Sequence, residues 1–181
     1  MCRLDHLALL AAYNRWMNEK TYAAAGTLSP QELARDRGAF FRSILGTLNH
    51  LAVADTVWLL RLRRHPVRLK ALDALAGTTA PTALDATLFD DLDALQRYRH
   101  TLDDVITALT QELTEADLDT ALEYTNMKGV AQRKNLHAVL MHVFNHQTHH
   151  RGQVSTLLFQ AGVDVGVTDL LALIPDLGVQ T

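Results

Sequence analysis

Apolar residues recur at steps of three and four along four long stretches of the 181-residue chain. This spacing places them on one face of an α-helix. The predicted helices cover about residues 4–25, 38–63, 87–113 and 135–161. Gly26 ends the first helix, Pro66 enforces the end of the second, and Gly162 caps the fourth. No stretch alternates apolar and polar residues as a sheet strand does, so the pattern predicts an all-α protein.

The connections between these helices carry weaker signals. Residues 29–32 combine an N-cap, a proline at the first helical position and an acidic first turn, which predicts a short helix. Residues 64–87 form a loose connection with room for one short helix, and residues 114–117 can cap a further turn. We expect a polar loop over 120–134, around Gly129. Because three connections are long, an alternating up-and-down order of the helices cannot be assumed.

The composition narrows the class of protein. Apolar residues make up 48% of the chain and charged residues 20%, which excludes disordered and low-complexity proteins. The length fits one domain that spans residues 1–181. The net charge of -3 gives no basic field for nucleic acid or a membrane surface, and we expect neither as a partner. Cys2 is the single cysteine, which excludes an internal disulfide and fits a reducing cytoplasm.

Histidines stand out in this composition: there are nine, and five of them lie between His137 and His150. On a helical wheel, His150 falls within the apolar stripe of the fourth helix and His146 on its edge, whereas His142 and His149 lie further toward solvent. A lone histidine on such a face is usually a core residue satisfied by one hydrogen bond. Two histidines at i and i+4 on one side of a helix are the arrangement that metalloproteins use to hold Zn²⁺ or a similar ion.

A third ligand for such an ion has to come from another helix. Three histidines at i, i+4 and i+8 span about 12 Å along a helix axis, so they do not readily share one ion. His50 on the second helix is the leading candidate, with His6 and His100 behind it. His50 lies at the margin of an apolar surface, and periodicity alone does not select it.

Two charged residues interrupt apolar faces. Asp55 falls in the middle of the apolar face of the second helix, where a carboxylate must be paired or hydrogen-bonded. It either orients a ligand histidine or pairs with a buried arginine. Arg99 interrupts the stripe of the third helix, and we interpret it as a side chain that reaches solvent from near the helix edge.

The end of the fourth helix carries a motif that resembles those of a known family. The motif is His146-Gln-Thr-His-His150-Arg151-Gly152-Gln153, followed by Leu157-Leu158 and Gly162-Val163. It is similar to the closing motif of the DinB (damage-inducible) and YfiT-like family of metalloenzymes. Further segments that resemble the family are Tyr13-Asn14-Arg15-Trp16, Leu48-Asn49-His50-Leu51, Trp58-Leu59 and Asp169-Leu170-Leu171 with Pro175. The resemblance therefore covers nearly the whole chain.

This resemblance implies a four-helix bundle with long crossover connections and a mononuclear metal site. Carried over residue by residue, the ligands are His50, His146 and His150. The resemblance also implies nickel or zinc as the ion, a homodimer, and activity as a thiol-dependent transferase or isomerase or as a metal-dependent hydrolase. The substrate would be a small molecule, with a low-molecular-weight thiol as one candidate. The family name records induction by DNA damage, which implies a stress response and no DNA binding.

Other chemistries find little support in the sequence. No G-x-S-x-G sequence surrounds a serine, and no glycine-rich phosphate loop precedes a helix. No glutamate lies three residues before a clustered histidine, as a di-iron bundle requires. We therefore expect an enzyme whose metal ion carries the reaction and in which Cys2 takes no part; no catalytic residue beyond the ligands is identified. The rival interpretation is a stress-response binding or scaffold protein with a non-catalytic or vestigial metal site.

The second helix also bears on the oligomeric state, because it is apolar around most of its circumference and a bundle covers only its inward side. We expect a homodimer that buries this helix or its neighbours. The residues expected at that contact are Phe41, Leu45, Trp58 and Leu60. In the alternative, short helices at 30–37 and 169–174 cover the same surface.

Overall fold

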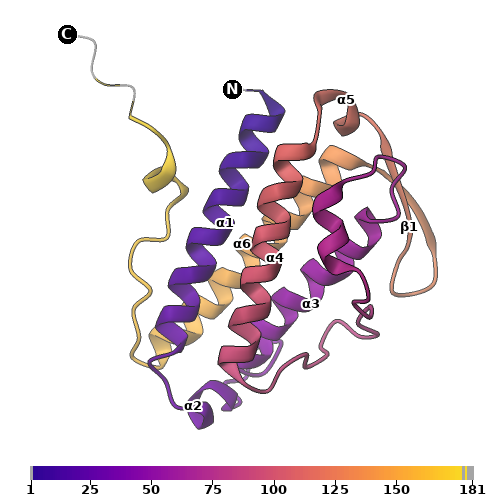
Figure 1. The fold of residues 1–181 in the computed structure, drawn as a ribbon. Helices are drawn as coiled ribbons and strands as arrows, with labels where there is room; N and C mark the ends of the chain where they lie inside the picture. Colours follow the sequence, from indigo (N-terminus) through magenta and orange to yellow (C-terminus); the bar gives the residue numbers. More distant parts are fainter. Residues whose placement is uncertain (1, 177, 179–181) are drawn as a thin grey trace.

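The computed structural model describes residues 2–176 and 178. Four long helices lie side by side in a bundle (Figure 1). They are α1 (Arg3–Ala25), α3 (Ile44–Leu62), α4 (Leu92–Glu112) and α6 (Leu136–Gln160). The mainly helical fold confirms the all-α class predicted from periodicity, with one small two-stranded sheet added to it.

The order of the helices is not simply alternating. Contacts run around the bundle from α1 to α4, from α4 to α3, from α3 to α6 and from α6 back to α1. Asn49 of α3 bonds to Phe89, just before α4, and Asp55 of α3 pairs with Arg99 of α4. Residue numbers therefore increase in the same direction along both helices, so α3 runs parallel to α4. Helices α1 and α6 run the opposite way (Figure 1). Two parallel neighbours need a crossover, which explains the long connection between α3 and α4.

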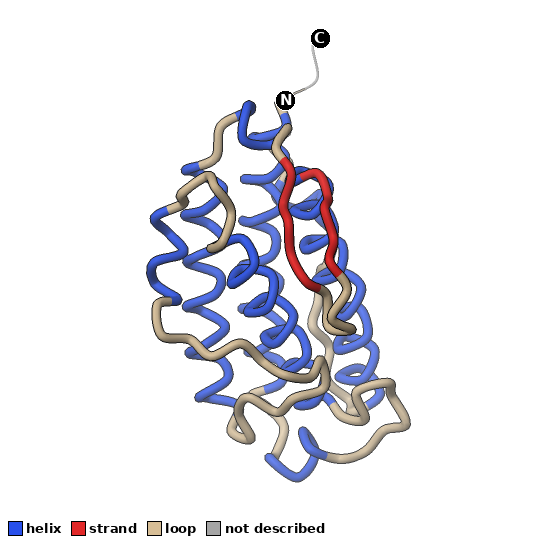
Figure 2. Tube along the Cα trace, turned by 90° about the vertical axis from the view of Figure 1, so that its right-hand side faces the viewer, coloured by secondary structure: helices blue, strands red, loops and turns tan. Residues whose placement is uncertain are grey.

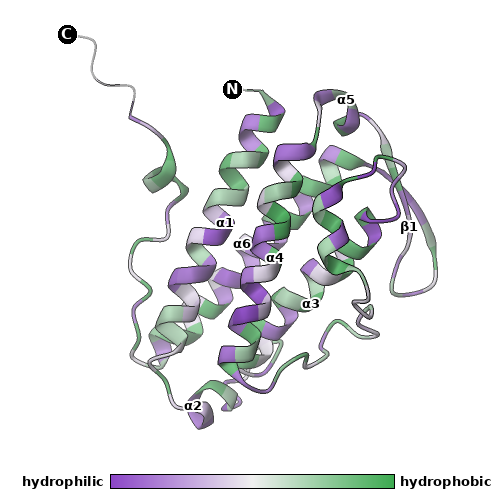
Figure 3. Cartoon of the chain, in the orientation of Figure 1, coloured by the Kyte–Doolittle hydropathy of each residue, from purple (hydrophilic) through white to green (hydrophobic). Residues whose placement is uncertain are grey.

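The core is built from aliphatic side chains of all four long helices. Leu7, Leu48, Leu102 and Leu158 are each no more than 1% exposed. The helices carry both hydrophobic and hydrophilic residues along their length, green and purple in Figure 3, as amphipathic helices of a bundle do. Each helix turns its apolar stripe toward the other three, and this burial is the main driving force for the fold.

Helix α3 begins later than its apolar pattern suggests. The predicted start near residue 38 is wrong, because Gly38 and Arg42 have φ values of 69° and 66°, which belong to the left-handed region. Residues Ala39 and Arg42 instead form a tight bridge. The helix starts at Ile44, after Ser43, whose hydroxyl oxygen accepts the N–H of Gly46.

Helix α4 also begins later than predicted, at Leu92 rather than near residue 87. Asp91 caps it by accepting the N–H of Ala94 at 2.8 Å. The residues before the cap are held by Asn49 of α3, whose side-chain oxygen accepts the N–H groups of Leu88 and Phe89. This long-range bond fastens the crossover segment against α3.

The prediction of a polar loop at 120–134 is also wrong, because these residues form a β-hairpin. Strands β1 (Ala121–Thr125) and β2 (Ala131–Asn135) pair antiparallel and lie along the bundle (red in Figure 2). The turn depends on Asn126, whose side-chain oxygen accepts the N–H groups of Lys128 and Val130. Gly129 supplies a φ of 77°. Only Leu122 of the hairpin is fully buried, so the short strands leave no strong apolar alternation in the sequence.

Short elements complete the fold. They are α2 (Pro30–Ala34), η1 (Lys70–Leu75), α5 (Glu115–Leu118) and η2 (Leu170–Leu173). The short helix expected from residue 30 is confirmed but ends at Ala34 rather than near residue 37, and the turn that residues 114–117 could cap is α5. η1 is the single short helix of the 64–87 connection. Of the two segments considered as covers for the apolar helix α3, α2 contacts it, whereas η2 lies beside α1 (yellow in Figure 1). Within the described residues, every helix is too short or too polar to cross a bilayer.

Candidate metal centre

Three histidines from two antiparallel helices face one another in the bundle. His50 comes from α3, and His146 and His150 lie one turn apart on α6. The Nε2 atom of His50 is 3.2 Å from Nε2 of His146 and 3.2 Å from Nε2 of His150. The ligand atoms of all three lie within 4.8 Å of one another. Nitrogens that each bind one tetrahedral Zn²⁺ ion at about 2.05 Å are separated by about 3.3 Å, so this spacing fits a single ion.

Hydrogen bonds at the outer nitrogens define the protonation of two of these rings. Nδ1 of His50 lies 2.8 Å from the carbonyl oxygen of Leu84, which can only accept, so Nδ1 carries the hydrogen. Nδ1 of His150 lies 2.8 Å from the side-chain oxygen of Gln153 and carries a hydrogen for the same reason. In a neutral imidazole the other nitrogen then bears a lone pair. The two Nε2 atoms therefore direct lone pairs toward each other, an arrangement that a cation between them stabilises.

Burial keeps the three rings neutral. Desolvation, followed by repulsion from His150, His50 and other nearby histidines, lowers the pKa of His146 to about 3. Desolvation also lowers the pKa of His50 and of His150 below the ordinary histidine value. Because only a neutral imidazole can bind a metal ion, this environment prepares the ligands at neutral pH.

Phe41 covers the histidine cluster from outside. Its ring stacks on that of His50, with centroids 3.7 Å apart and an angle of 16° between the planes, and meets the edge of His150 at 5.5 Å. The loop that carries Phe41 lies so close to α3 that a Cβ atom on Gly46 would overlap the Phe41 carbonyl oxygen. Gly46 and the left-handed Arg42 thus hold the aromatic ring over His50.

The remaining histidines of the fourth helix lie outside the cluster, as the helical wheel predicted. His142 and His149 are exposed. His142 contacts Trp58 with ring centroids 5.3 Å apart, and His149 interacts with Gln153. The two alternative third ligands, His6 and His100, are exposed and are not part of the cluster. Of the candidates considered, the fold brings His50 to the pair on α6.

Asp55 and Arg99 form an ion pair inside the bundle. Nη1 of Arg99 is 2.7 Å from Oδ2 of Asp55, and its Nη2 is 3.0 Å from Oδ1 of Asp103. The interpretation of Arg99 as a side chain that reaches solvent is wrong, since its exposed fraction is 2%. Burial alone would lower the pKa of Arg99, but the carboxylates of Asp103 and Asp55 outweigh it and raise that pKa above its ordinary value. Of the two roles considered for Asp55, the structure shows the pairing with an arginine.

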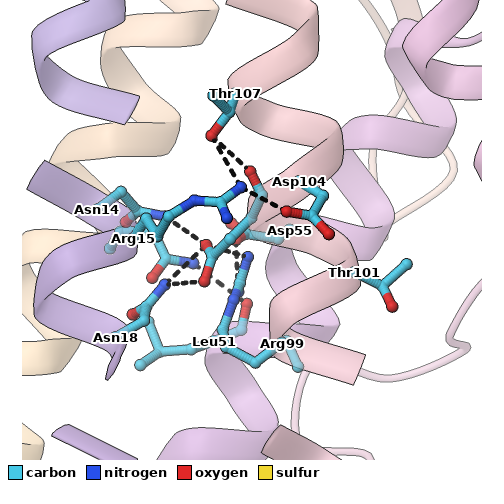
Figure 4. Close-up of polar contacts among 12 residues, drawn as sticks. Asn14, Arg15, Asn18, Leu51, Asp55, Arg99, Thr101, Asp104 and Thr107 are labelled. Carbon is cyan, nitrogen blue, oxygen red and sulfur yellow. Dashed lines mark hydrogen bonds and ion pairs between the residues drawn. The ribbon is translucent and has the colours of Figure 1, made fainter. Parts of the chain in front are cut away.

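This ion pair belongs to a buried polar cluster that joins all four long helices. Figure 4 shows the part of it on α1, α3 and α4. Asn14 and Asn18 of α1 donate to Asp103 at 3.1 and 2.9 Å. Arg151 of α6 donates to Asn14 and, at 3.1 Å, to Gln147. Gln147 and Arg151 each follow a clustered histidine by one position, so their buried bonds set the rotation of α6 that turns His146 and His150 toward α3.

The histidine cluster opens into a cavity of about 720 Å³, within the size range of small-molecule sites. Its apolar wall consists of Phe40, Phe41 and Leu84, and Phe40 is 85% exposed at the mouth. Its polar wall consists of Asp85, His149 and Gln153. No serine or cysteine lines this cavity in the described part of the chain.

Fold and cluster together define a class: a helical-bundle protein in which three histidines on two antiparallel helices are placed to bind one metal ion. Sequence comparison gives the family. A sequence model of the DinB family matches residues 1–176, and the chain therefore belongs to the DinB family, as the motif around His146 and His150 indicated.

Two relatives agree with this membership. Protein DinB of Bacillus subtilis (strain 168) is 24% identical over 172 residues, which cover 91% of this chain and 91% of the relative. The crystal structure of a DinB-like protein from Bacillus cereus ATCC 10987 superposes with a TM-score of 0.56 at 23% identity, covering 84% of this chain and 91% of that one. This structural likeness shows a shared fold.

Sequence reasoning did not assign a role beside the cluster to several residues. Gln153 lies three residues after His150, and this i, i+3 spacing was an available signal. The Leu84 carbonyl left no signal, because it sits on an irregular segment that the fold brings to α3. Phe41, which was expected at a dimer contact of the second helix, lies before the start of α3 and stacks on His50 instead. Asp85 is exposed on the same crossover segment and could not be placed at the cavity without the structure.

Proposed function

We propose that this chain is a metal-dependent enzyme of the DinB family in which His50, His146 and His150 hold one zinc or nickel ion. The observation that carries the proposal is the pair of facing Nε2 atoms at 3.2 Å, whose Nδ1 partners place a lone pair on each in the neutral ring. Three protein ligands leave coordination positions for a substrate, as in catalytic zinc sites. Structural zinc sites usually have four protein ligands.

The cavity supports a small-molecule substrate with an apolar portion. Phe40, Phe41 and Leu84 offer apolar surface beside the cluster, while the opposite wall is polar. A bound divalent ion supplies Lewis-acid chemistry there, which makes a thiol or water more acidic and polarises a carbonyl. The chain then orients the substrate and shields it from water with the Phe41 ring. We favour transfer of a thiol over hydrolysis, since the apolar wall suits an organic co-substrate.

A proton released in such a reaction needs an acceptor near the cluster. Asp85 and His149 are the titratable side chains that line the cavity without belonging to the three-histidine cluster. The side-chain oxygen of Gln153 faces Nδ1 of His150, and its amide nitrogen donates to Nε2 of His149 at 3.2 Å. His149 is thereby linked to a ligand histidine, and we propose Asp85 as the freer proton acceptor.

The first test measures metal content and affinity. Protein purified without added metal should contain about one equivalent of a divalent ion, and His50→Ala, His146→Ala and His150→Ala should each lose it. His142→Ala is the matched control on α6, one turn before His146 and exposed, and it should retain the ion. Equal losses in His142→Ala and His150→Ala would show that the ion binds elsewhere.

The second test measures turnover. Metal-loaded protein should conjugate a low-molecular-weight thiol to chlorodinitrobenzene faster than the free ion does, and Asp85→Asn should slow the reaction while metal content stays the same. Cys2→Ala should leave the rate unchanged, because Cys2 is exposed at the start of α1 and does not line the cavity. A metal-loaded protein without activity on thiol and ester substrates would favour the binding or scaffold role instead.

A further inference from the structure

A second cleft lies along the same helix as His50 but nearer its C-terminal end. Its volume is about 640 Å³, and it is bounded by α3, the β-hairpin and residues 80–81. Arg61 and Arg64 line it. Arg61 lies eleven positions after His50 on the helix, which corresponds to about 16 Å along the axis. The cleft is therefore distinct from the histidine cavity.

The cleft lies in the most basic segment of a chain whose net charge is -3. The segment from 61 to 70 contains five cationic residues: Arg61, Arg63, Arg64, Arg68 and Lys70. Arg68 pairs with Asp73, but within the described residues neither Arg61 nor Arg64 has a carboxylate within ion-pair distance. Cations at the end of α3 complement the helix dipole, which explains their sign but not their position in a cleft.

Arg61 is held in place before any ligand arrives. Its guanidinium lies 4.6 Å from the ring centroid of Trp58 and 4.6 Å from that of Tyr124. One of its nitrogens donates to the carbonyl oxygen of Thr125 at 3.2 Å. Guanidinium has five N–H groups, so donors remain for a ligand. Because the side chain is already ordered, binding costs less conformational entropy than it would for a free surface arginine.

The walls of the cleft fit the body of an organic molecule. Val57, Leu60, Pro81 and Met127 supply apolar surface. The one acidic residue on the lining, Glu123, is paired with Arg133 at 3.2 Å, so it adds little net negative charge. The cationic side and the apolar side face the same space.

We propose that this cleft is a binding site for a small organic anion with an aromatic or aliphatic body. Its carboxylate, phosphate or sulfonate group would accept hydrogen bonds from Arg61 and Arg64, and its body would pack on Leu60, Pro81 and Met127. Arginine binds such oxyanions in a two-pronged geometry, which favours it over lysine for this role. The site is independent of the metal centre and does not rest on the function proposed above.

The test uses naphthalene-2-sulfonate as the probe. Two control ligands each keep one part of it: uncharged 2-naphthylmethanol keeps the aromatic body, and inorganic sulfate keeps the anionic group. Calorimetric titration of the full chain should show binding of the sulfonate that exceeds that of either half and weakens with added salt. Arg61→Gln and Arg64→Gln should each weaken it by about tenfold or more, since each removes a charged hydrogen bond. The matched control is Arg68→Gln, an exposed arginine of the same segment that does not line this cleft.

A second measurement locates the probe even if a variant folds poorly. The chain has two tryptophans, and the indole N–H resonance of Trp58, next to Arg61, should shift on titration while that of Trp16 does not. His50→Ala should leave the affinity unchanged, because the histidine cavity lies elsewhere. Equal binding of the uncharged analogue, an unchanged affinity in Arg61→Gln, or a loss in His50→Ala would each overturn the proposal. Salt-sensitive binding of an oligonucleotide without binding of the sulfonate would also overturn it and assign the basic segment to a polyanion.

Discussion

The buried ion pair of Asp55 and Arg99 leads to a prediction whose size can be worked out from the structure. The surrounding cluster contains two carboxylates, Asp55 and Asp103, and two guanidinium groups, Arg99 and Arg151, so its formal charges cancel. Burial lowers the pKa of Arg151 to about 10, which still leaves it charged at neutral pH. Asp55→Asn removes one negative charge and leaves a net positive charge inside the bundle.

Breaking a buried pair by removing one partner costs about 3 to 5 kcal/mol of stability. We expect about 3 kcal/mol for Asp55→Asn, since Arg99 keeps Asp103 at 3.0 Å. Arg99→Met leaves two carboxylates against Arg151 alone and should cost at least as much. In the double variant the charges of Asp103 and Arg151 cancel again, so its loss should be about 2 kcal/mol smaller than the sum of the single losses.

The assay is urea unfolding of the metal-free protein at neutral pH, followed by circular dichroism. The matched control is Arg15→Met, which breaks an ion pair of the same helix α4, with α1 in place of α3, at the surface of the bundle. The side chains of Arg15 and Asp104 are 33% and 69% exposed. That change should cost less than about 1 kcal/mol. Additivity of the two core substitutions within about 0.5 kcal/mol would refute the reasoning, as would an equal loss in Arg15→Met.

Four further predictions concern the metal centre and the assembly. Gly46→Ala should displace the Phe41 loop and so lower the metal affinity measured by calorimetry. The Cβ atom of Gly152→Ala meets nothing within 4 Å, so this variant should be more stable by about 0.5 to 1 kcal/mol in urea unfolding. Gln153→Leu should weaken metal binding by about 10- to 100-fold, and full affinity would exclude its orienting role. The pKa of His146 is about 3 in the folded protein and 6.5 ordinarily, so below pH 6.5 the unfolded chain binds a proton that the folded protein does not. The metal-free protein should therefore lose stability as pH falls below 6.5. Equal stability in urea between pH 7 and 5 would contradict this. We predict a homodimer, which a monomer in sedimentation at micromolar concentration would disprove.

The sequence alone determined the elements that depend on local chemistry. Apolar periodicity located the four long helices, and the proline after Ser29 and the glycine at 162 located ends that the structure keeps. The i, i+4 spacing of His146 and His150 fixed them on one side of a helix, because helix geometry is the same in every protein. The family motif added His50, which periodicity did not select.

Only the tertiary structure decided the features that depend on contacts distant in the chain. The bond from His50 to the Leu84 carbonyl joins residues 34 positions apart, and it determines which nitrogen faces the cluster. The pairing of Asp55 with Arg99 and the stacking of Phe41 on His50 likewise follow from how the helices and loops are placed. Helical periodicity reports which face of a helix is buried but not which partner it meets. The protonation of the ligands, the polar cluster that rotates α6 and the second cleft therefore emerge only when the helices are assembled.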